Sequence, residues 1–227
     1  MSYPKNPNQI VIQNEFYPHG LTEKDIWDYY EKNKPLILKN IIGRNIMFFI
    51  ATDINKTVVK RKINESPIRL NYSNFNEIIT GRTISIHSEM GMIENFGIVD
   101  VDVDDFHKAK LATLEVYHIL NQYKLFTDVK IRYTGKTSFH VIVYFKRKVE
   151  VSYIKNMLEQ YIKETPLINK FTMKHKRDIK TPNLDLYRNV YRAAFISEGS
   201  LSVDGLRCIE VNPRYLRTFR KELARIK

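Results

Sequence analysis

Alternation of apolar and polar residues predicts strands in two parts of the chain. Before residue 90, strands are expected at NIMFFIAT (45–52), KTVVKRK (56–62) and TISIH (83–87), which are rich in β-branched and aromatic residues. A helix precedes them, because Thr22 and Asp25 form a capping box and an apolar side follows as far as Pro35. From residue 96 the pattern predicts strand 96–104, helix 105–123, strands 128–134 and 139–145, helix 152–164, and further strands at 191–196 and 206–211.

The order β-α-β-β-α-β in the second part indicates an α+β fold. It is the split βαβ arrangement of ferredoxin-like and RNA-recognition folds, and an αβ lobe from the N-terminal part would pack beside it. No Gly/Ser-rich or Pro-rich linker divides the chain, which has 8 glycines and 8 prolines in all. We therefore expect one domain, 1–227, with approximate lobes 1–90 and 91–227.

Composition indicates a globular protein of the cytoplasm. The chain has 227 residues, of which 43% are hydrophobic and 27% charged. It has no apolar run of the roughly 18 to 20 residues that cross a membrane, and its start lacks a signal pattern. The single cysteine, Cys208, excludes an internal disulfide, and the six histidines show no paired spacing, which argues against zinc.

The positive charge suggests a polyanionic partner. The chain has 37 Lys and Arg residues and 25 Asp and Glu residues, so its net charge is 37 − 25 = +12 and its pI is near 9.6. Nucleic acid is the first interpretation and solubility through charge is the alternative. The cations gather at 56–62, 146–148, 174–177 and 214–227, and aromatic residues lie near these clusters, as stacking on bases requires.

An acidic strand carries the first candidate chemistry. In GIVDVDVDDF, Asp100, Asp102 and Asp104 alternate with valines, so a strand sends the three carboxylates to one face, and Asp105 adds a fourth charge at its end. Carboxylates this close repel unless a cation lies among them, and oxygen ligands suit Mg²⁺ or Mn²⁺. An EF-hand is excluded, because the segment lacks the glycine and the glutamate that an EF-hand loop requires. Two alternatives remain open: a solvated edge strand whose acids prevent aggregation, and a nuclease-type acidic cluster.

A third carboxylate is needed to hold two metal ions, and Asp185 is the candidate. It lies between Leu184 and Leu186, as an inward-facing ligand among apolar residues would. An aspartate that caps a short helix is the alternative.

The segment YTGKTSFHVIVYF (133–145) contains a Gly-Lys-Thr but is not a P-loop. Lys130 occupies the position of the required glycine, and alternating β-formers rather than a helix follow His140. A strand, a polar turn and a second strand remain. An ordinary hairpin turn with a solvated lysine is the alternative to a phosphate site, and a histidine satisfied in the core is the alternative for His140.

Three segments together resemble the motifs of the archaeo-eukaryotic primase superfamily. VDVDVDD, YTGKTSFHVIV and LDLYRNVYRAAFIS are similar to its DxD strand, its turn with a histidine, and its hydrophobic-Asp element. The likeness is greatest to the polymerase domain of bacterial and archaeal ligase D and its stand-alone relatives. There, segments 16–44, 83–91 and 184–189 resemble the opening helix with its GR turn, the ELH strand and the DxxRN element.

The resemblance implies a primase-polymerase fold, with an N-terminal αβ lobe packed on an RNA-recognition-like catalytic lobe. It also implies a set of site residues. The metal ligands would be Asp100, Asp102 and Asp185, with Asp104 as substitute if the register slips by two. The nucleotide would be bound by Thr134, Lys136, Ser138, His140, Arg188, Arg192 and Ser197.

The activity implied by the resemblance is template-directed nucleotidyl transfer by a DNA primase or polymerase. Its cofactor would be Mn²⁺ or Mg²⁺, its substrates nucleoside triphosphates, and its partners a DNA template and primer, held in part by Lys60, Arg61 and Lys62. Replication or end-joining proteins would be further partners, in repair or replication at a prokaryotic nucleoid, with no membrane partner. A non-catalytic RNA-recognition-like module and a metal-dependent nuclease are the alternative functions.

Overall fold

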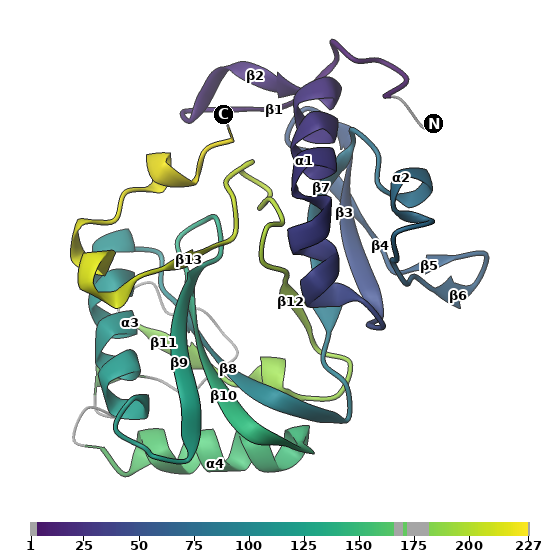
Figure 1. Ribbon diagram of the computed structural model, residues 1–227. Helices are drawn as coiled ribbons and strands as arrows, with labels where there is room; N and C mark the ends of the chain where they lie inside the picture. The colour runs from purple at the N-terminus through teal and green to yellow at the C-terminus, as the bar shows by residue number, and fades with distance from the viewer. Residues whose placement is uncertain (1–3, 166–169, 172–181, 227) are drawn as a thin grey trace. The chain divides into compact units, whose positions relative to one another are not determined.

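The computed structural model describes residues 4–165, 170–171 and 182–226, and the chain divides into two compact units (Figure 1). Unit 1 comprises residues 1–89, 194–209 and 220–227, and unit 2 comprises residues 90–193 and 210–219. The change of unit after Glu89 coincides with the expected change of lobe near residue 90. Residues 194–209 and 220–227, however, group with unit 1 although the sequence assigns them to the second lobe. That the two units form one primase-polymerase domain stays a prediction.

Unit 1 is built on an antiparallel four-stranded sheet in the order β12-β7-β3-β4. Its strands are β3 (Ile46–Asp53), β4 (Lys56–Lys60), β7 (Thr83–Glu89) and β12 (Ala194–Ile196). The other elements are α1 (Glu23–Ile41), α2 (Phe75–Ile78), the 3₁₀ turn η4 (Lys221–Ala224) and the two-stranded pairs β1 (Ile10–Asn14) with β2 (Tyr17–Thr22) and β5 (Lys62–Ile63) with β6 (Ser66–Pro67).

Helix α1 begins where the sequence predicts and continues beyond the predicted end. The capping box is present, with reciprocal hydrogen bonds between Thr22 and Asp25. Pro35 lies inside the helix, which runs on to Ile41. A proline removes one backbone donor, but the apolar face continues past it, and packing in the core stabilises a helix more than a single backbone bond does. The predicted end near Pro35 is therefore wrong.

Unit 2 is built on a five-stranded sheet in the order β11-β8-β10-β9-β13. Along the chain the elements are β8 (Ile93–Asp102), α3 (Phe106–Leu120), β9 (Phe126–Tyr133), β10 (Phe139–Glu150), α4 (Val151–Lys163), β11 (Asn183–Asp185), the 3₁₀ turn η2 (Tyr187–Asn189), β13 (Ile209–Val211) and the 3₁₀ turn η3 (Pro213–Thr218). Strand β8 pairs antiparallel with β10 and β11, and β10 pairs antiparallel with β9.

The predicted order β-α-β-β-α-β is present in unit 2, but its last strand is β11 and not residues 191–196. Within that range, β12 pairs with β7 in the sheet of unit 1. Strand β11 has three residues, which is too short a run for alternation to reveal.

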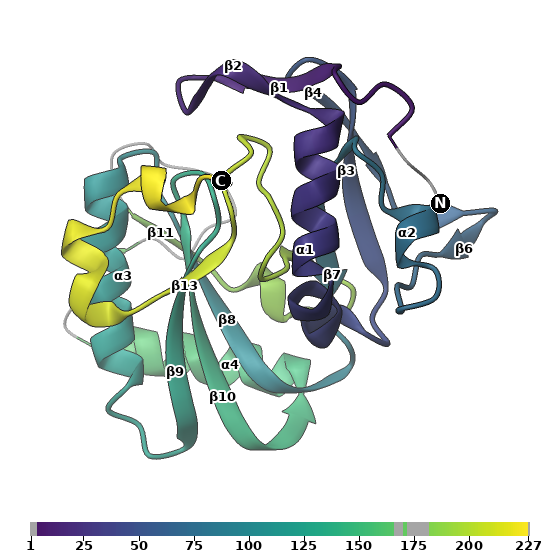
Figure 2. The same ribbon diagram turned by 45° about the horizontal axis from the view of Figure 1, so that its top comes forward.

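The two faces of the unit 2 sheet differ in character. The valines of β8 and β10, such as Val99 and Val141, form a core with α3 and α4, which Figure 2 shows against the strands. At Gly97 of β8 an added Cβ would lie 2.5 Å from Ile154 Cγ2 and 2.9 Å from Leu158 Cδ1, so the absence of a side chain lets α4 approach the strand. Because side chains alternate along a strand, Asp100 and Asp102 project from the face opposite to this core.

No helix in the described part of the chain is both long enough and apolar enough to cross a membrane.

Candidate active site

Asp100 lies at the centre of a row of polar residues that crosses the sheet of unit 2. In the strand register it stands opposite His140 of β10 on one side and opposite Asp185 of β11 on the other. His140 in turn stands opposite Arg132 of β9. Side chains directly opposite one another on neighbouring strands lie on the same face, about 5 Å apart at their Cβ atoms. We call Asp185, Asp100, His140 and Arg132 the polar row.

Two nitrogen-bearing side chains flank the Asp100 carboxylate. His140 Nε2 lies 3.8 Å from Asp100 Oδ1, and Arg188 Nε of η2 lies 3.8 Å from Asp100 Oδ2. Asp100 is 7% exposed and His140 is 2% exposed. Little water screens charges at this depth, so they interact more strongly than at the surface. Arg188, and His140 when it is protonated, therefore offset part of the carboxylate charge.

The acidic strand is shorter than the sequence predicts. Strand β8 ends at Asp102, which stands opposite Asn183 of β11 and shares a face with Asp100. Asp104 is exposed beyond the strand end, so its predicted position on that face is wrong. Asp105 is the N-cap of α3, where its Oδ1 accepts a hydrogen bond of 2.7 Å from the Lys108 N–H. Two of the four clustered acids therefore belong to a turn and a helix cap.

Asp185 lies opposite Asp100 and has the alternative role of a cap, while its role as a third ligand stays a prediction. Its Oδ1 accepts a hydrogen bond of 2.6 Å from the Tyr187 N–H, which begins η2. An aspartate that accepts a bond from the backbone two residues on is a common turn former. The same residue thus fixes the start of η2 and adds a carboxylate to the polar row.

The donor set suits a hard divalent cation, although its side chains do not form a compact cluster. Asp100, Asp102 and Asp185 offer carboxylate oxygens, the ligands that Mg²⁺ and Mn²⁺ prefer. Like charges directly opposite each other on neighbouring strands destabilise a sheet, and a cation between Asp100 and Asp185 would relieve this. Within residues 4–165, 170–171 and 182–226, no group of three or more His, Cys, Asp or Glu side chains is drawn together closely enough to hold a metal ion. The residues therefore fit the metal in chemistry and strand position, while their side chains do not converge.

The turn between β9 and β10 is a hairpin, so the P-loop is excluded as predicted. Thr134 Oγ1 lies 2.9 Å from the Ser138 carbonyl oxygen and 2.8 Å from Ser138 Oγ, and the Thr134 N–H donates to the same carbonyl at 3.2 Å. Gly135 has φ 92°, a conformation that side chains disfavour. Lys136 is exposed at the tip, and the Tyr133 hydroxyl donates to its carbonyl at 2.9 Å. Phosphate binding by this turn stays a prediction.

The remaining predicted residues lie outside the polar row. Arg192 is in the turn before β12 at φ 64°, with its guanidinium 5.1 Å from the centroid of the Tyr191 ring. Ser197 is buried in unit 1, where its hydroxyl donates to Ser88 Oγ at 3.3 Å. The exposed cations where β4 ends and β5 begins also belong to unit 1: Lys60, Arg61 and Lys62. The basic cluster at 174–177 lies outside the described residues.

Two residues of the site region were missed by sequence reasoning. Arg132, 7% exposed, is the fourth member of the polar row, and its signal was its place on the polar face of a strand beside His140. Asn189 is fully buried: its Nδ2 donates to the Ile98 carbonyl at 2.6 Å, and its Oδ1 accepts from the Ile98 N–H at 2.9 Å. Asn189 thereby holds η2, and with it Arg188, against the edge of β8.

Comparison with known proteins gives a likeness at the level of the fold. No protein-family model matches the chain, and no curated protein matches it either. Among solved structures, it is similar to the polymerase domain of Mycobacterium tuberculosis ligase D in complex with DNA. The TM-score is 0.70 at 14% sequence identity, over 97% of this chain and 90% of that one. The chain therefore has the fold of a ligase D polymerase domain, as its resemblance to the archaeo-eukaryotic primase superfamily predicts.

Proposed function

We propose that the chain is a template-directed nucleotidyltransferase, a DNA primase or polymerase. In the reaction, the 3′-hydroxyl oxygen of a primer forms a bond to the α-phosphorus of a nucleoside triphosphate, the hydroxyl loses its proton, and pyrophosphate leaves. The observation that carries the proposal is the register that brings Asp185 and His140 to either side of Asp100, with Asp102 on the same face.

Two further findings support it. The chain is similar in fold to a polymerase domain whose solved structure contains DNA. Its net charge of +12 suits a partner rich in phosphates. Against the alternative of a non-catalytic RNA-recognition-like module, the polar row carries acids and a histidine where such modules display stacking aromatics.

In this proposal Asp100, Asp102 and Asp185 hold Mn²⁺ or Mg²⁺. When bound, the metal would supply charge stabilisation at the phosphoryl oxygens and lower the pKa of the attacking hydroxyl. Paired strands fix the backbones that carry the carboxylates, and their side chains would turn toward one another when the metal binds.

The other side chains orient the triphosphate. His140 donates a hydrogen bond to a phosphate oxygen rather than acting as a general base, and Arg188 adds a fixed cation on the opposite side of Asp100. Lys136 reaches phosphate from the exposed tip of a turn that the Thr134 and Ser138 hydroxyls stiffen. Arg192 and Ser197 complete the nucleotide contacts.

The wider proposal follows the resemblance. The two units belong to one catalytic domain, and Lys60, Arg61 and Lys62 contact template or primer. The enzyme acts in repair or replication at the nucleoid of a prokaryotic cell, together with replication or end-joining proteins.

The test is incorporation of labelled nucleotides on a DNA template, with and without a primer, with each ribonucleotide and deoxyribonucleotide, and with Mg²⁺ or Mn²⁺. Asp102→Asn should reduce incorporation by about 100-fold or more, because it removes a charged ligand of similar size. Asp104→Asn is the matched control, since this aspartate is exposed beyond the end of β8. It should leave incorporation within about twofold, as surface substitutions do.

The other outcomes of this assay would point to a different site or to a different function. Equal activity of wild type and Asp102→Asn would remove Asp102 from the active site. Shortening of labelled DNA without added nucleotides would favour the nuclease, and DNA binding with neither reaction would favour the non-catalytic module.

A further inference from the structure

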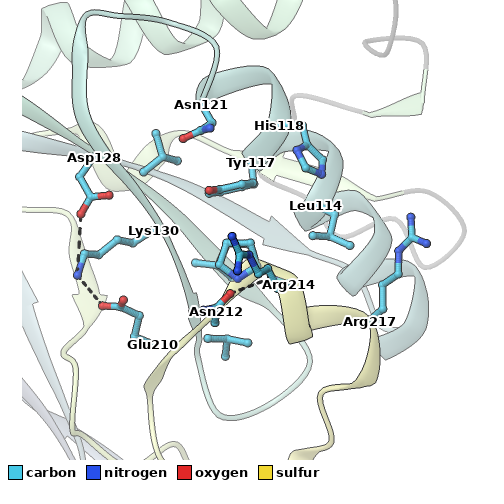
Figure 3. A pocket seen from close by; sticks show the side chains of 14 residues that line it. Leu114, Tyr117, His118, Asn121, Asp128, Lys130, Glu210, Asn212, Arg214 and Arg217 are labelled. Carbon is cyan, nitrogen blue, oxygen red and sulfur yellow. Dashed lines mark hydrogen bonds and ion pairs between the residues drawn. The ribbon is translucent and has the colours of Figure 1, made fainter.

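An open groove of about 1030 Å³ lies in unit 2 between α3, β9 and the segment that contains β13 and η3 (Figure 3). It is lined by 14 residues, none of which belongs to the polar row. The C-terminal basic segment that the sequence analysis noted contributes one wall. The groove is therefore separate from the proposed catalytic residues and uses cations to which the proposed mechanism gives no role.

The acidic side chains of the groove are gathered at one end. Lys130 Nζ lies 2.8 Å from Glu210 Oε2 and 4.0 Å from Asp128 Oδ2, and Figure 3 shows the three side chains together. The hydrogen bond that Lys130 donates to Glu210 raises the pKa of Lys130, so the lysine keeps its charge there. One cation thus offsets part of the charge of both acids.

The other end of the groove is cationic. Arg217 of η3 and His118 of α3 line it, and Arg214 of η3 lies nearer the middle, beside Asn212 (Figure 3). The two arginines are three residues apart in a 3₁₀ turn, a rise of about 6 Å along its axis. Figure 3 shows their side chains reaching to different parts of the groove, so each can bind a different phosphate of one strand. Within the described ranges, no carboxylate forms an ion pair with the guanidinium of Arg214 or Arg217.

Groups suited to bases lie between the two ends. Tyr117, Asn121 and Asn212 line the middle of the groove. The Asn212 Oδ1 accepts from the Arg214 N–H at 2.9 Å, which fixes the orientation of its amide. Side-chain amides hydrogen-bond base edges, and aromatic rings stack on bases. An open groove also admits a chain that enters and leaves, whereas sites for small molecules bury most of their ligand.

We propose that this groove binds a single strand of nucleic acid, with different phosphates on Arg214 and Arg217. This inference rests on the proposed function in one respect: it takes the bound strand to be the template for nucleotide addition at the polar row. Guanidinium groups bind phosphate oxygens in pairs, which gives the two arginines more than a point-charge role.

The test is fluorescence anisotropy of a labelled 12-nucleotide oligo-dT, titrated with the full chain without metal or nucleotide, at several salt concentrations. Arg214→Ala/Arg217→Ala should weaken binding by about tenfold and reduce the slope of log K against log salt by about 1.4, from 0.7 for each phosphate contact. The matched control is Lys32→Ala/Lys39→Ala, which removes the same charge from two exposed positions of α1. It should change the slope far less.

A second double variant covers a failure to fold. Arg214→Lys/Arg217→Lys keeps both charges, so it should retain the salt slope while it lowers affinity through the loss of paired hydrogen bonds. Equal weakening by the groove and the α1 double variants would mean diffuse attraction and would overturn the proposal. So would displacement of the oligonucleotide by millimolar dTMP, which would mean a site for free nucleotides. Because no incorporation is measured, failure here leaves the nucleotidyltransferase proposal standing, and failure of incorporation leaves this one standing.

Discussion

Asn189 and Ile98 exchange two hydrogen bonds between a side-chain amide and a backbone peptide, two residues before Asp100 on β8. The Asn189 amide bonds the backbone N–H and carbonyl of Ile98 at the edge of β8, as a neighbouring strand would. From Asp100 onward, β11 pairs with the same edge. The turn that carries Arg188 is thereby fixed to the strand that carries Asp100.

Replacement of Asn189 should lower the stability of the fold. Asn189→Ala leaves the Ile98 N–H and carbonyl without these partners, and a buried polar group without a partner costs about 1–3 kcal/mol. We expect the free energy of unfolding to fall by about 2–4 kcal/mol in urea titrations. Asn40→Ala is the control, because the Asn40 amide donates to the Leu36 carbonyl at the helix surface, and it should cost less than about 1 kcal/mol. Equal costs would show that the bonds to Ile98 add nothing.

Arg188 should act on the nucleotide more than on the fold. Arg188→Met removes a cation whose Nε lies 3.8 Å from Asp100 Oδ2. A charged hydrogen bond contributes about 1.5–3 kcal/mol, so kcat/KM for incorporation should fall by about 10-fold to 100-fold. Steady-state kinetics at fixed DNA would measure this, and Arg188→Lys should restore part of the loss. An unchanged kcat/KM would remove Arg188 from the nucleotide contacts.

Arg132 should bind substrate although the motifs did not reveal it. Its position opposite His140 brings a buried guanidinium to the face where the triphosphate is proposed to lie. Arg132→Met should raise KM for the nucleotide about tenfold or more, whereas Arg132→Lys should raise it less. A purely structural arginine would instead lower the urea midpoint and leave KM of the folded enzyme unchanged.

Stability should decline in alkali because of a buried tyrosine in unit 1. Tyr30 is fully buried, its hydroxyl donates to the Ile84 carbonyl at 2.9 Å and accepts from the Leu201 N–H at 3.2 Å. Burial raises the pKa of Tyr30 above its ordinary value of 10.0. The unfolded state therefore loses the phenolic proton first, so this contribution to stability is complete below pH 10.0 and decreases as the pH rises further.

Urea titrations between pH 8 and pH 11 would measure that decline. Tyr30→Phe should flatten it and should cost about 1–3 kcal/mol at neutral pH, because two backbone groups lose their partner. Persistence of the full decline in Tyr30→Phe would assign it to other groups, of which Tyr29 is the first to examine, since burial raises its pKa as well.

The sequence predicted the parts of the fold that have long periodic patterns. The strands around Asp100 and His140 alternate over many residues, so their faces followed from period two alone. Strand β11 has three residues, and its partner is chosen by tertiary pairing with β8, which local pattern does not reveal. The helix past Pro35 was missed for a related reason, because burial of Ile37 and Leu38 outweighs a local helix breaker.

Residues of the candidate site that belong to a sequence motif could be predicted. Residues that only the pairing of strands brings to the site could not. Asp100, Asp102, Asp185 and His140 came from motifs. Arg132 stands in the polar row only because β9 pairs with β10 in one register. Asp104 was misread because an alternating pattern carries no mark of where the strand stops, and a helix begins just beyond it, where Asp105 Oδ1 accepts a capping hydrogen bond from the Lys108 N–H.

Gly97 gives the acidic strand a second requirement. Ile154 and Leu158 of α4 occupy the space where its side chain would be, while Asp100 and Asp102 look out from the other face of the same strand. The spacing Gly-x-x-Asp-x-Asp therefore meets two requirements of β8. The glycine lets α4 pack closely against one face of the strand, and the two aspartates present carboxylates on the opposite face. In a homologue that keeps both aspartates but has a bulky residue in place of Gly97, α4 would have to lie farther from the sheet. The residue at this position therefore indicates how closely the helix packs against the acidic strand.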